Sequence, residues 1–143
     1  MNKTNHETSK NALKEQLQHA FNNCDHIACA YLFGSVAKGI EGALSDIDIA
    51  VLLENHSDIE SERTKIESGI CNALKRSDID LIILNEAPFS LAYRILRDGI
   101  VLIAPNLKAK ENFEVRTIMN YLDFQPLLNS ALETSRQEIL KGQ

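Results

Sequence analysis

The sequence has little cysteine, no tryptophan and no excess of basic residues. Its three cysteines form no Cys-x-x-Cys motif, and a metal site built from Cys24, His26 and Cys29 would lack a suitably spaced fourth ligand. We therefore expect reduced thiols, as in a cytoplasmic protein. Lys and Arg number 15 against 20 Asp and Glu, which gives a net charge of −5. Because a nucleic-acid groove normally needs a basic stripe, this charge argues against direct nucleic-acid binding.

The sequence also lacks a long apolar run. No segment approaches the roughly 20 residues that span a bilayer, and the amino terminus, MNKTNHETSK, is polar and contains no signal-peptide core. We therefore expect a soluble protein that makes no membrane contact. The chain has 143 residues, 44% of them hydrophobic, which suffices for one domain with a proper core.

The rest of the chain is organised around one stretch, YLFGSVAKGIEGALSDIDIAVLL, at positions 31–53. The apolar run 27–33 has the length of a strand, and Gly34 ends it by permitting backbone angles that a side chain would resist. A second apolar run resumes directly after Asp46-Ile47-Asp48. The pattern therefore predicts two strands joined by a polar connection that carries glycine.

The two aspartates of this stretch are predicted to share one face of the second strand. Side chains alternate along a strand, so Asp46 and Asp48 would lie about 6.6 Å apart at their Cα atoms, opposite Ile47. Two such carboxylates are suitable ligands for Mg²⁺, which takes oxygen ligands and keeps positions for water and phosphate. An interpretation without catalysis is also open, because Asp46 could simply solvate the start of the strand.

The corner before the aspartates is a candidate phosphate site. Gly34 and Ser35 offer backbone N–H groups and a hydroxyl, and a short helical turn from Val36 would direct its amino-terminal end at an anion. Lys38 would lie one turn further on and could neutralise a phosphate oxygen. An exposed loop lysine that is merely solvated is an equally good interpretation of Lys38.

A third carboxylate would be needed to activate a nucleophile, and it is predicted in the run SDIDLIIL at positions 77–84. This run also has the pattern of a strand. If it lies beside the second strand, neighbours about 4.8 Å apart would place Asp80 level with the first pair. Asp78 shares that face, so the pattern does not decide between them; we favour Asp80 because the continuous apolar run flanks it.

These elements resemble a known family. Gly34-Ser35, then ten residues, Asp46-x-Asp48 and a later strand carboxylate are similar to the signature of the DNA polymerase β-type nucleotidyltransferase superfamily. The small size and the segments SDIDLIILNEAPFSLAYRILRDG and NYLDFQPLL resemble its minimal members, the MNT-type antitoxins encoded beside HEPN toxins. The resemblance covers most of the chain from about residue 27 onward.

The resemblance implies a fold and a chemistry. The fold would be α/β (α+β), the minimal polymerase β-type arrangement of a small mixed sheet with flanking helices and a long C-terminal helical arm. Asp46, Asp48 and Asp80 would be catalytic and would hold two Mg²⁺ ions, while Gly34, Ser35 and Lys38 would bind ATP. The implied reaction transfers AMP from ATP to a tyrosine hydroxyl of a HEPN toxin, with which the chain would form a hetero-oligomer.

The remaining elements are predicted from helical periodicity and capping signals. A first helix is expected from Thr8 or Ser9, and a second from the capping box Ser57-x-x-Glu60 to about Arg76. A third would have Pro88 in its first turn and Gly99 as its stop, followed by a short strand over 100–104.

The last segment is predicted to be helical to the end of the chain. We divide the chain into a nucleotidyltransferase domain, residues 1–104, and a helical arm, residues 105–143. Pro126 should kink or interrupt this helix because it cannot donate a backbone hydrogen bond. After Pro126, the apolar residues Leu127, Leu128, Leu132 and Ile139 would form either core or a partner surface.

Two other functions remain open from the sequence. The chain could be an antitoxin that acts by binding alone, or a nucleotidyltransferase that modifies a small molecule of the aminoglycoside type. The pair Arg94 and Arg97 could approach a triphosphate or a partner, but a solvated surface position explains both residues equally well.

Overall fold

The computed structural model describes residues 2–34, 37, 46–54 and 58–141. Within these residues the chain forms one four-stranded sheet in the order β3-β2-β1-β4. Strand β1 is antiparallel to both of its neighbours, and β2 is parallel to β3. The strands are β1 (Ile27–Phe33), β2 (Ile47–Leu53), β3 (Ile79–Ile83) and β4 (Ile100–Ile103).

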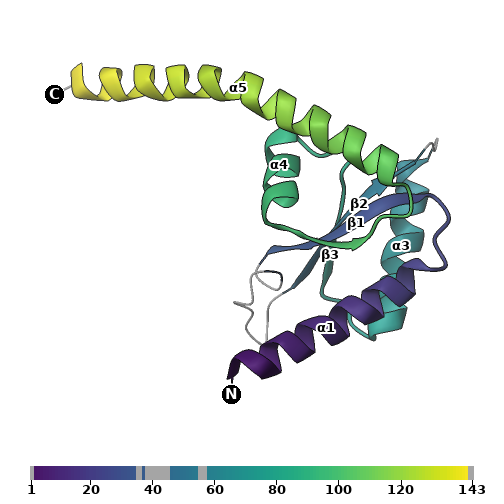
Figure 1. The fold of residues 1–143 in the computed structure, drawn as a ribbon. Helices are drawn as coiled ribbons and strands as arrows, with labels where there is room; N and C mark the ends of the chain where they lie inside the picture. The colour runs from purple at the N-terminus through teal and green to yellow at the C-terminus, as the bar shows by residue number, and fades with distance from the viewer. Residues whose placement is uncertain (1, 35–36, 38–45, 55–57, 142–143) are drawn as a thin grey trace.

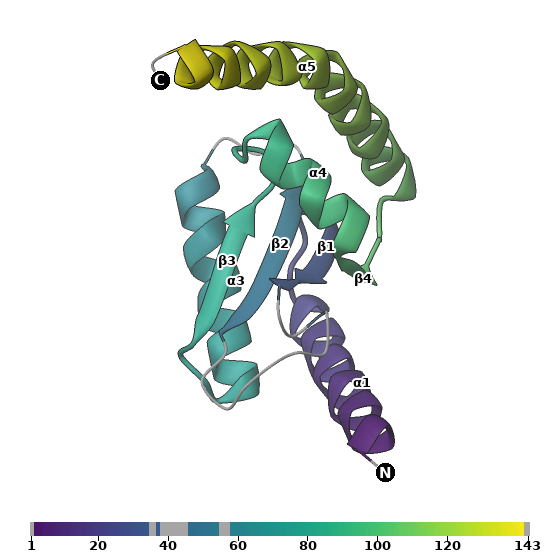
Figure 2. The ribbon, with the colours of Figure 1, turned by 90° about the vertical axis from the view of Figure 1, so that its left-hand side faces the viewer.

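Helices cover both faces of this mixed sheet (Figures 1 and 2). One face is covered by α1 (Asn2–Phe21) and α3 (Ile59–Leu74), and the other by α4 (Phe89–Asp98) and α5 (Leu107–Lys141). The predicted fold class, a small mixed sheet with flanking helices and a long C-terminal helix, is therefore confirmed.

The alternation of side chains along β2 explains how one strand serves both layers. Ile47, Ile49 and Val51 belong to the core beneath α1 and α3. Ala50 and Leu52 belong to the second core, beneath α4 and α5. Because both faces are buried, the strand reads as an almost continuous apolar run, as the sequence indicated.

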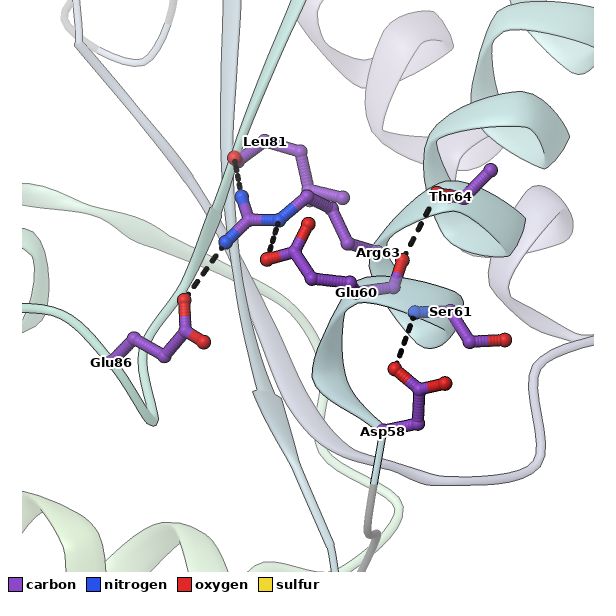
Figure 3. Close-up of polar contacts among 7 residues, drawn as sticks. All are labelled: Asp58, Glu60, Ser61, Arg63, Thr64, Leu81 and Glu86. Carbon is purple, nitrogen blue, oxygen red and sulfur yellow. Dashed lines mark hydrogen bonds and ion pairs between the residues drawn. The ribbon is translucent and has the colours of Figure 1, made fainter.

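Two helix starts differ from the predictions. Helix α1 begins at Asn2 rather than at Thr8 or Ser9, because its first two turns are polar and give no apolar periodicity to detect. Helix α3 is capped by Asp58, whose Oδ1 accepts a hydrogen bond from the backbone N–H of Ser61 at 3.1 Å (Figure 3). The predicted capping box is therefore wrong by one residue, and Ser57 itself lies outside the described residues.

Helix α4 and strand β4 lie close to their predicted positions. Pro88 is the N-cap of α4 rather than a residue of its first turn. Gly99 ends the helix as predicted, but with an extended backbone, and its N–H donates to the Ile95 carbonyl at 2.7 Å. The predicted strand over 100–104 is confirmed except for its last residue.

Helix α5 continues through Pro126 without interruption and bends along its length (Figure 1). Its first half packs on α4, where Tyr121 stacks on Tyr93 at 3.8 Å between centroids and Phe124 meets Phe89 edge to face at 5.1 Å. In the described residues no helix is long and apolar enough to cross a membrane.

Candidate active site

The turn after β1 depends on a glycine. Gly34 has a φ of +77°, in the left-handed region that other residues rarely adopt. Phe33 pairs with Asp48 across the β1–β2 ladder, so the turn lies directly beside that aspartate. A Cβ atom at Gly34 would overlap Asp48 Oδ2 and would lie 3.0 Å from the carboxyl carbon. The glycine therefore gives the Asp48 carboxylate its place against the backbone.

The parallel ladder between β2 and β3 brings two of the predicted carboxylates to one level. Asp48 and Asp80 are register partners, and the Ile47 N–H donates to the Asp78 carbonyl at 2.9 Å where the ladder begins. Asp46 stands immediately before β2 and is exposed. The expectation that Asp80 lies level with the Asp46/Asp48 pair agrees with this register.

The three carboxylates interact electrostatically. Partial burial raises the pKa of Asp48, and the neighbouring charges of Asp80 and Asp46 and hydrogen bonding with the Asp80 carboxyl raise it further. Like charges that approach in this way are costly unless a cation neutralises them. The arrangement is therefore suited to a positively charged ligand at the ends of β1, β2 and β3.

The alternative third carboxylate, Asp78, is engaged elsewhere. Arg76 Nε donates to Asp78 Oδ1 at 2.7 Å, and a second guanidinium nitrogen bonds the other carboxylate oxygen. This hydrogen bonding holds the pKa of Asp78 below its ordinary value. Asp80 is thus the register partner of Asp48, whereas Asp78 is bonded to Arg76. This difference favours Asp80 over Asp78 as the third carboxylate.

A clamp from α3 fixes β3 next to Asp80 (Figure 3). Arg63 Nη1 donates to the Leu81 carbonyl at 3.2 Å, and Nη2 pairs with Glu86 at 3.0 Å. The same guanidinium lies 3.4 Å from Glu60 Oε1 through Nε. Because Leu81 follows Asp80 directly, this planar fork holds the backbone that carries the third carboxylate. Arg63 could not be predicted from the sequence, since no residue near it indicates that Leu81 and Glu86 are its partners.

The donor set suits a hard divalent cation. Carboxylate oxygens are the ligands that Mg²⁺ prefers, and two adjacent carboxylates with a third in electrostatic range match a site that leaves positions for water and phosphate. In the described part of the chain, no three His, Cys, Asp or Glu side chains converge into a finished metal-binding group. Asp48 and Asp80 are within hydrogen-bonding reach of each other, and Asp46 acts on Asp48 through its charge.

The predicted phosphate corner is described only in part. Ser35 and Lys38 lie outside the described residues, so the structure leaves their predicted roles untested. Ala37, between them, is buried, and its carbonyl accepts a hydrogen bond from Lys10 Nζ at 2.8 Å. This contact ties α1 to the corner across 27 residues of sequence, a link with no local sequence signal.

A hollow of about 290 Å³ opens beside Gly34, between the end of β1 and α4. Arg94 and Arg97 both contribute to its wall, which also includes Phe33 and Gly34 at the end of β1. Arg97 is paired with Asp98 at 2.9 Å. In the sequence, the signal for this pair was that Arg94 and Arg97 are three residues apart on one helix. The lining residues are Phe33, Gly34, Leu91, Arg94, Ile95, Arg97 and Asp98.

A second hollow, of about 400 Å³, lies between α1 and α3 and has none of the three aspartates in its wall. Cys24 and His26 line it, whereas Cys29 is buried in β1. All three cysteines are free thiols, as the sequence predicted. Burial raises the pKa of Cys29 to about 11, which keeps this thiol protonated.

The chain is similar in sequence to known nucleotidyltransferases and in structure to known toxin–antitoxin proteins. The family model for polymerase beta nucleotidyltransferases matches residues 15–108. The protein adenylyltransferase MntA of Shewanella oneidensis is 34% identical over 103 residues, which are 72% of each chain. A crystal structure of a toxin–antitoxin with AMP-PNP matches with a TM-score of 0.69 and 28% identity, over 85% of this chain and 96% of that one.

A further solved structure, the tri-AMPylated Shewanella oneidensis HEPN toxin in complex with MNT antitoxin, matches with a TM-score of 0.64 and 25% identity. The match covers 87% of this chain and 97% of the other. The matched family region contains the glycine turn and all three aspartates.

Proposed function

This chain belongs to the polymerase beta nucleotidyltransferase family, and we propose that it is an antitoxin that transfers AMP from ATP to a tyrosine hydroxyl of a cognate HEPN ribonuclease toxin. The observation that carries the proposal is the meeting of Asp48 and Asp80 across neighbouring strands, with Asp46 in range, beside a glycine that leaves room for the Asp48 carboxylate. The relative MntA, a protein adenylyltransferase, supports the reaction class.

The nucleotide would lie at the glycine end of β1. Arg94 and Arg97 line the hollow beside Gly34, and Arg94 would neutralise a phosphate oxygen, whereas Arg97 is paired with Asp98. Ser35 and Lys38 would complete the phosphate contacts from the corner. The structural similarity to a toxin–antitoxin with AMP-PNP supports an adenine nucleotide as the substrate.

The three aspartates would hold two Mg²⁺ ions, which when bound neutralise the triphosphate and the charge that develops on the entering and leaving oxygens. Asp80 would accept the proton of the tyrosine hydroxyl. The tyrosine oxygen then forms a bond to the α-phosphorus, the bond from the α-phosphorus to the bridging oxygen breaks, and pyrophosphate leaves. The chain's own contribution is position: the strand register holds the base beside the nucleotide site.

The acceptor is proposed to be a protein because the chain is 34% identical to MntA, a protein adenylyltransferase. Beyond residue 104 the described structure has only α5, and half of that helix packs on α4 and β1. The described side chains of the other half are exposed and could contact such an acceptor. The complex of a tri-AMPylated HEPN toxin with its MNT antitoxin supports a toxin in this role.

The test is to mix the purified chain with its cognate HEPN toxin, Mg²⁺ and ATP and to measure the intact mass of the toxin. We expect mass increments in multiples of AMP, located on tyrosine, and none when EDTA replaces Mg²⁺. An unchanged toxin mass under conditions where the two proteins bind would contradict the proposal.

Two alternatives give different results in the same system. An antitoxin that acts by binding alone would still neutralise the toxin after Asp46→Asn and Asp48→Asn together. A small-molecule nucleotidyltransferase would release pyrophosphate with an aminoglycoside and no protein partner. We expect neither result, because the neighbouring carboxylates of Asp48 and Asp80 suit a metal-dependent transfer and the relative MntA is a protein adenylyltransferase.

A further inference from the structure

Helix α5 has two apolar faces, and only one of them is covered. The covered face carries Phe113 and Thr117, which are buried, and the two aromatic residues that contact α4. The opposite face carries four apolar side chains, 40–59% exposed, at positions i, i+3, i+4 and i+7. We call this set the α5 row: Val115, Ile118, Met119 and Leu122.

A helix that is apolar on opposite sides is normally buried on both. The inner face of α5 meets that expectation, and Glu114 anchors it by accepting a hydrogen bond from the Tyr31 hydroxyl at 3.0 Å. The α5 row points the other way and lies on the same rigid half of the helix. Four contiguous exposed apolar side chains on a fixed helix mark an interaction surface.

The helix also extends beyond the domain it packs on. Phe124 contacts the first residue of α4. Beyond Phe124, the described side chains up to residue 138 are exposed. They include Leu127 and Leu132, at 68% and 60% exposure. This half projects beyond α4, toward the side of the molecule where β1 ends and β2 begins (Figure 1). A partner on α5 could therefore also reach the proposed catalytic end of the sheet.

We propose that the α5 row is the docking surface for the toxin, with Leu127 and Leu132 extending the contact. This inference rests on the proposed function and names the surface by which the protein acceptor is held. A tyrosine side chain entering the site would by itself give little affinity, so the transferase needs a second contact outside the reaction centre.

The size of the surface favours the toxin over a second copy of this chain. A stable interface buries about 800 Å² per partner, and four partly exposed side chains supply much less. Two copies joined only through the α5 row would fall short of that area. The toxin must also contact the Gly34 end of the sheet to be modified, which adds interface area that a second copy of this chain would not need to use. The solved relatives occur in toxin–antitoxin complexes, which agrees with this choice.

The test compares toxin binding by two variants that add the same charge. The row variant is Ile118→Lys with Leu122→Lys; the control is Gln16→Lys with Asn72→Lys, at exposed polar positions on α1 and α3. Titration with the cognate toxin in the absence of ATP should show at least a tenfold weaker affinity for the row variant, roughly what loss of an interface centre causes. The control should bind as the unmodified chain does.

Circular dichroism and urea unfolding check that the row variant is folded, and Ile118→Ser with Leu122→Ser replaces it if it is not. Unchanged toxin affinity of a folded row variant would overturn the docking proposal. A second result would also overturn it: the unmodified chain is dimeric by light scattering, whereas the row variant is monomeric and still binds the toxin. A second copy of the chain would then be what covers the α5 row.

The two proposals fail in different ways. If the unmodified chain binds the toxin through α5 but leaves its mass unchanged with ATP and Mg²⁺, the reaction is wrong and the docking surface stands. If the unmodified chain adds AMP and the row variant binds and adds AMP equally well, the docking surface is wrong and the reaction stands.

Discussion

Gly34→Ala tests how strictly the glycine turn and the Asp48 carboxylate are coupled. Gly34 has a φ of +77°, and an added Cβ would overlap Asp48 Oδ2 and lie 3.0 and 3.3 Å from the next two carbons of that side chain. The carboxylate is the free end of a side chain and can rotate away. The substitution should therefore displace Asp48 rather than unfold the protein.

The magnitudes follow from these two effects. A non-glycine residue in the left-handed region costs about 1–2 kcal/mol, and the smaller conformational freedom of alanine in the unfolded chain returns about 0.4–1 kcal/mol of this. We expect a net loss of about 1 kcal/mol in the free energy of unfolding. A displacement of about 1 Å in a reacting group can lower the rate about 100-fold, so AMP transfer should fall far more than stability.

Urea unfolding and the initial rate of AMP incorporation into the toxin measure the two effects separately. Gly69→Ala is the matched control, because Gly69 lies inside α3 and an added Cβ there meets no atom within 4 Å. It should stabilise the chain by about 0.5–1 kcal/mol and leave the rate unchanged. If Gly34→Ala keeps the full rate, Asp48 does not depend on the glycine for its position, and the reasoning fails.

Three further substitutions have definite expected outcomes. Asp48→Asn should stabilise the metal-free protein in EDTA by up to about 1 kcal/mol at neutral pH, since burial and the charges of Asp80 and Asp46 raise the pKa of Asp48. The raised pKa means that the native state of the unmodified chain loses stability as the pH rises from about 3.9, the unfolded value, through the raised one. The advantage of Asp48→Asn should therefore grow over that interval, and an advantage present only at acid pH would contradict this sign. Arg63→Ala should cost about 1–2 kcal/mol in urea unfolding because the Leu81 carbonyl loses its donor, and Arg63→Lys should not restore it; an unchanged midpoint would show that the clamp is dispensable. Lys75→Gly should stabilise by up to about 1 kcal/mol, because Lys75 ends α3 with a φ of 55°, and thermal unfolding would reveal a lower melting temperature if this is wrong.

The sheet and its acidic edge could be predicted from the sequence because both depend on local pattern. The residues of 27–33, and those of 47–53 apart from Asp48, are apolar, which indicates strands buried on both faces. The two-residue period places Ile47 opposite its flanking aspartates. The preference for Asp80 followed from its place in an apolar run, and the β2–β3 register agrees with it.

The elements that sequence reasoning missed depend on contacts between distant residues. Lys10 bonds the Ala37 carbonyl and Arg63 bonds the Leu81 carbonyl, and neither partner is indicated by the residues around it. The start of α1 was missed because polar turns carry no apolar period, and the cap of α3 because Asp58 also fits the N-cap position next to the Ser57 signal. The roles of Ser35 and Lys38 stay predictions.

The central claim is that carboxylates on neighbouring strands form one catalytic group, and the third carboxylate tests it most directly. The measurement is the incorporation of labelled AMP into the cognate toxin by Asp80→Asn and Asp78→Asn, side by side with the unmodified chain. Asp78 is half-buried and pairs with Arg76 instead of with Asp48, so its substitution should leave the rate within about twofold. Asp80→Asn should reduce incorporation by at least about 100-fold while toxin binding persists. Full activity of Asp80→Asn, or loss of activity confined to Asp78→Asn, would contradict the account.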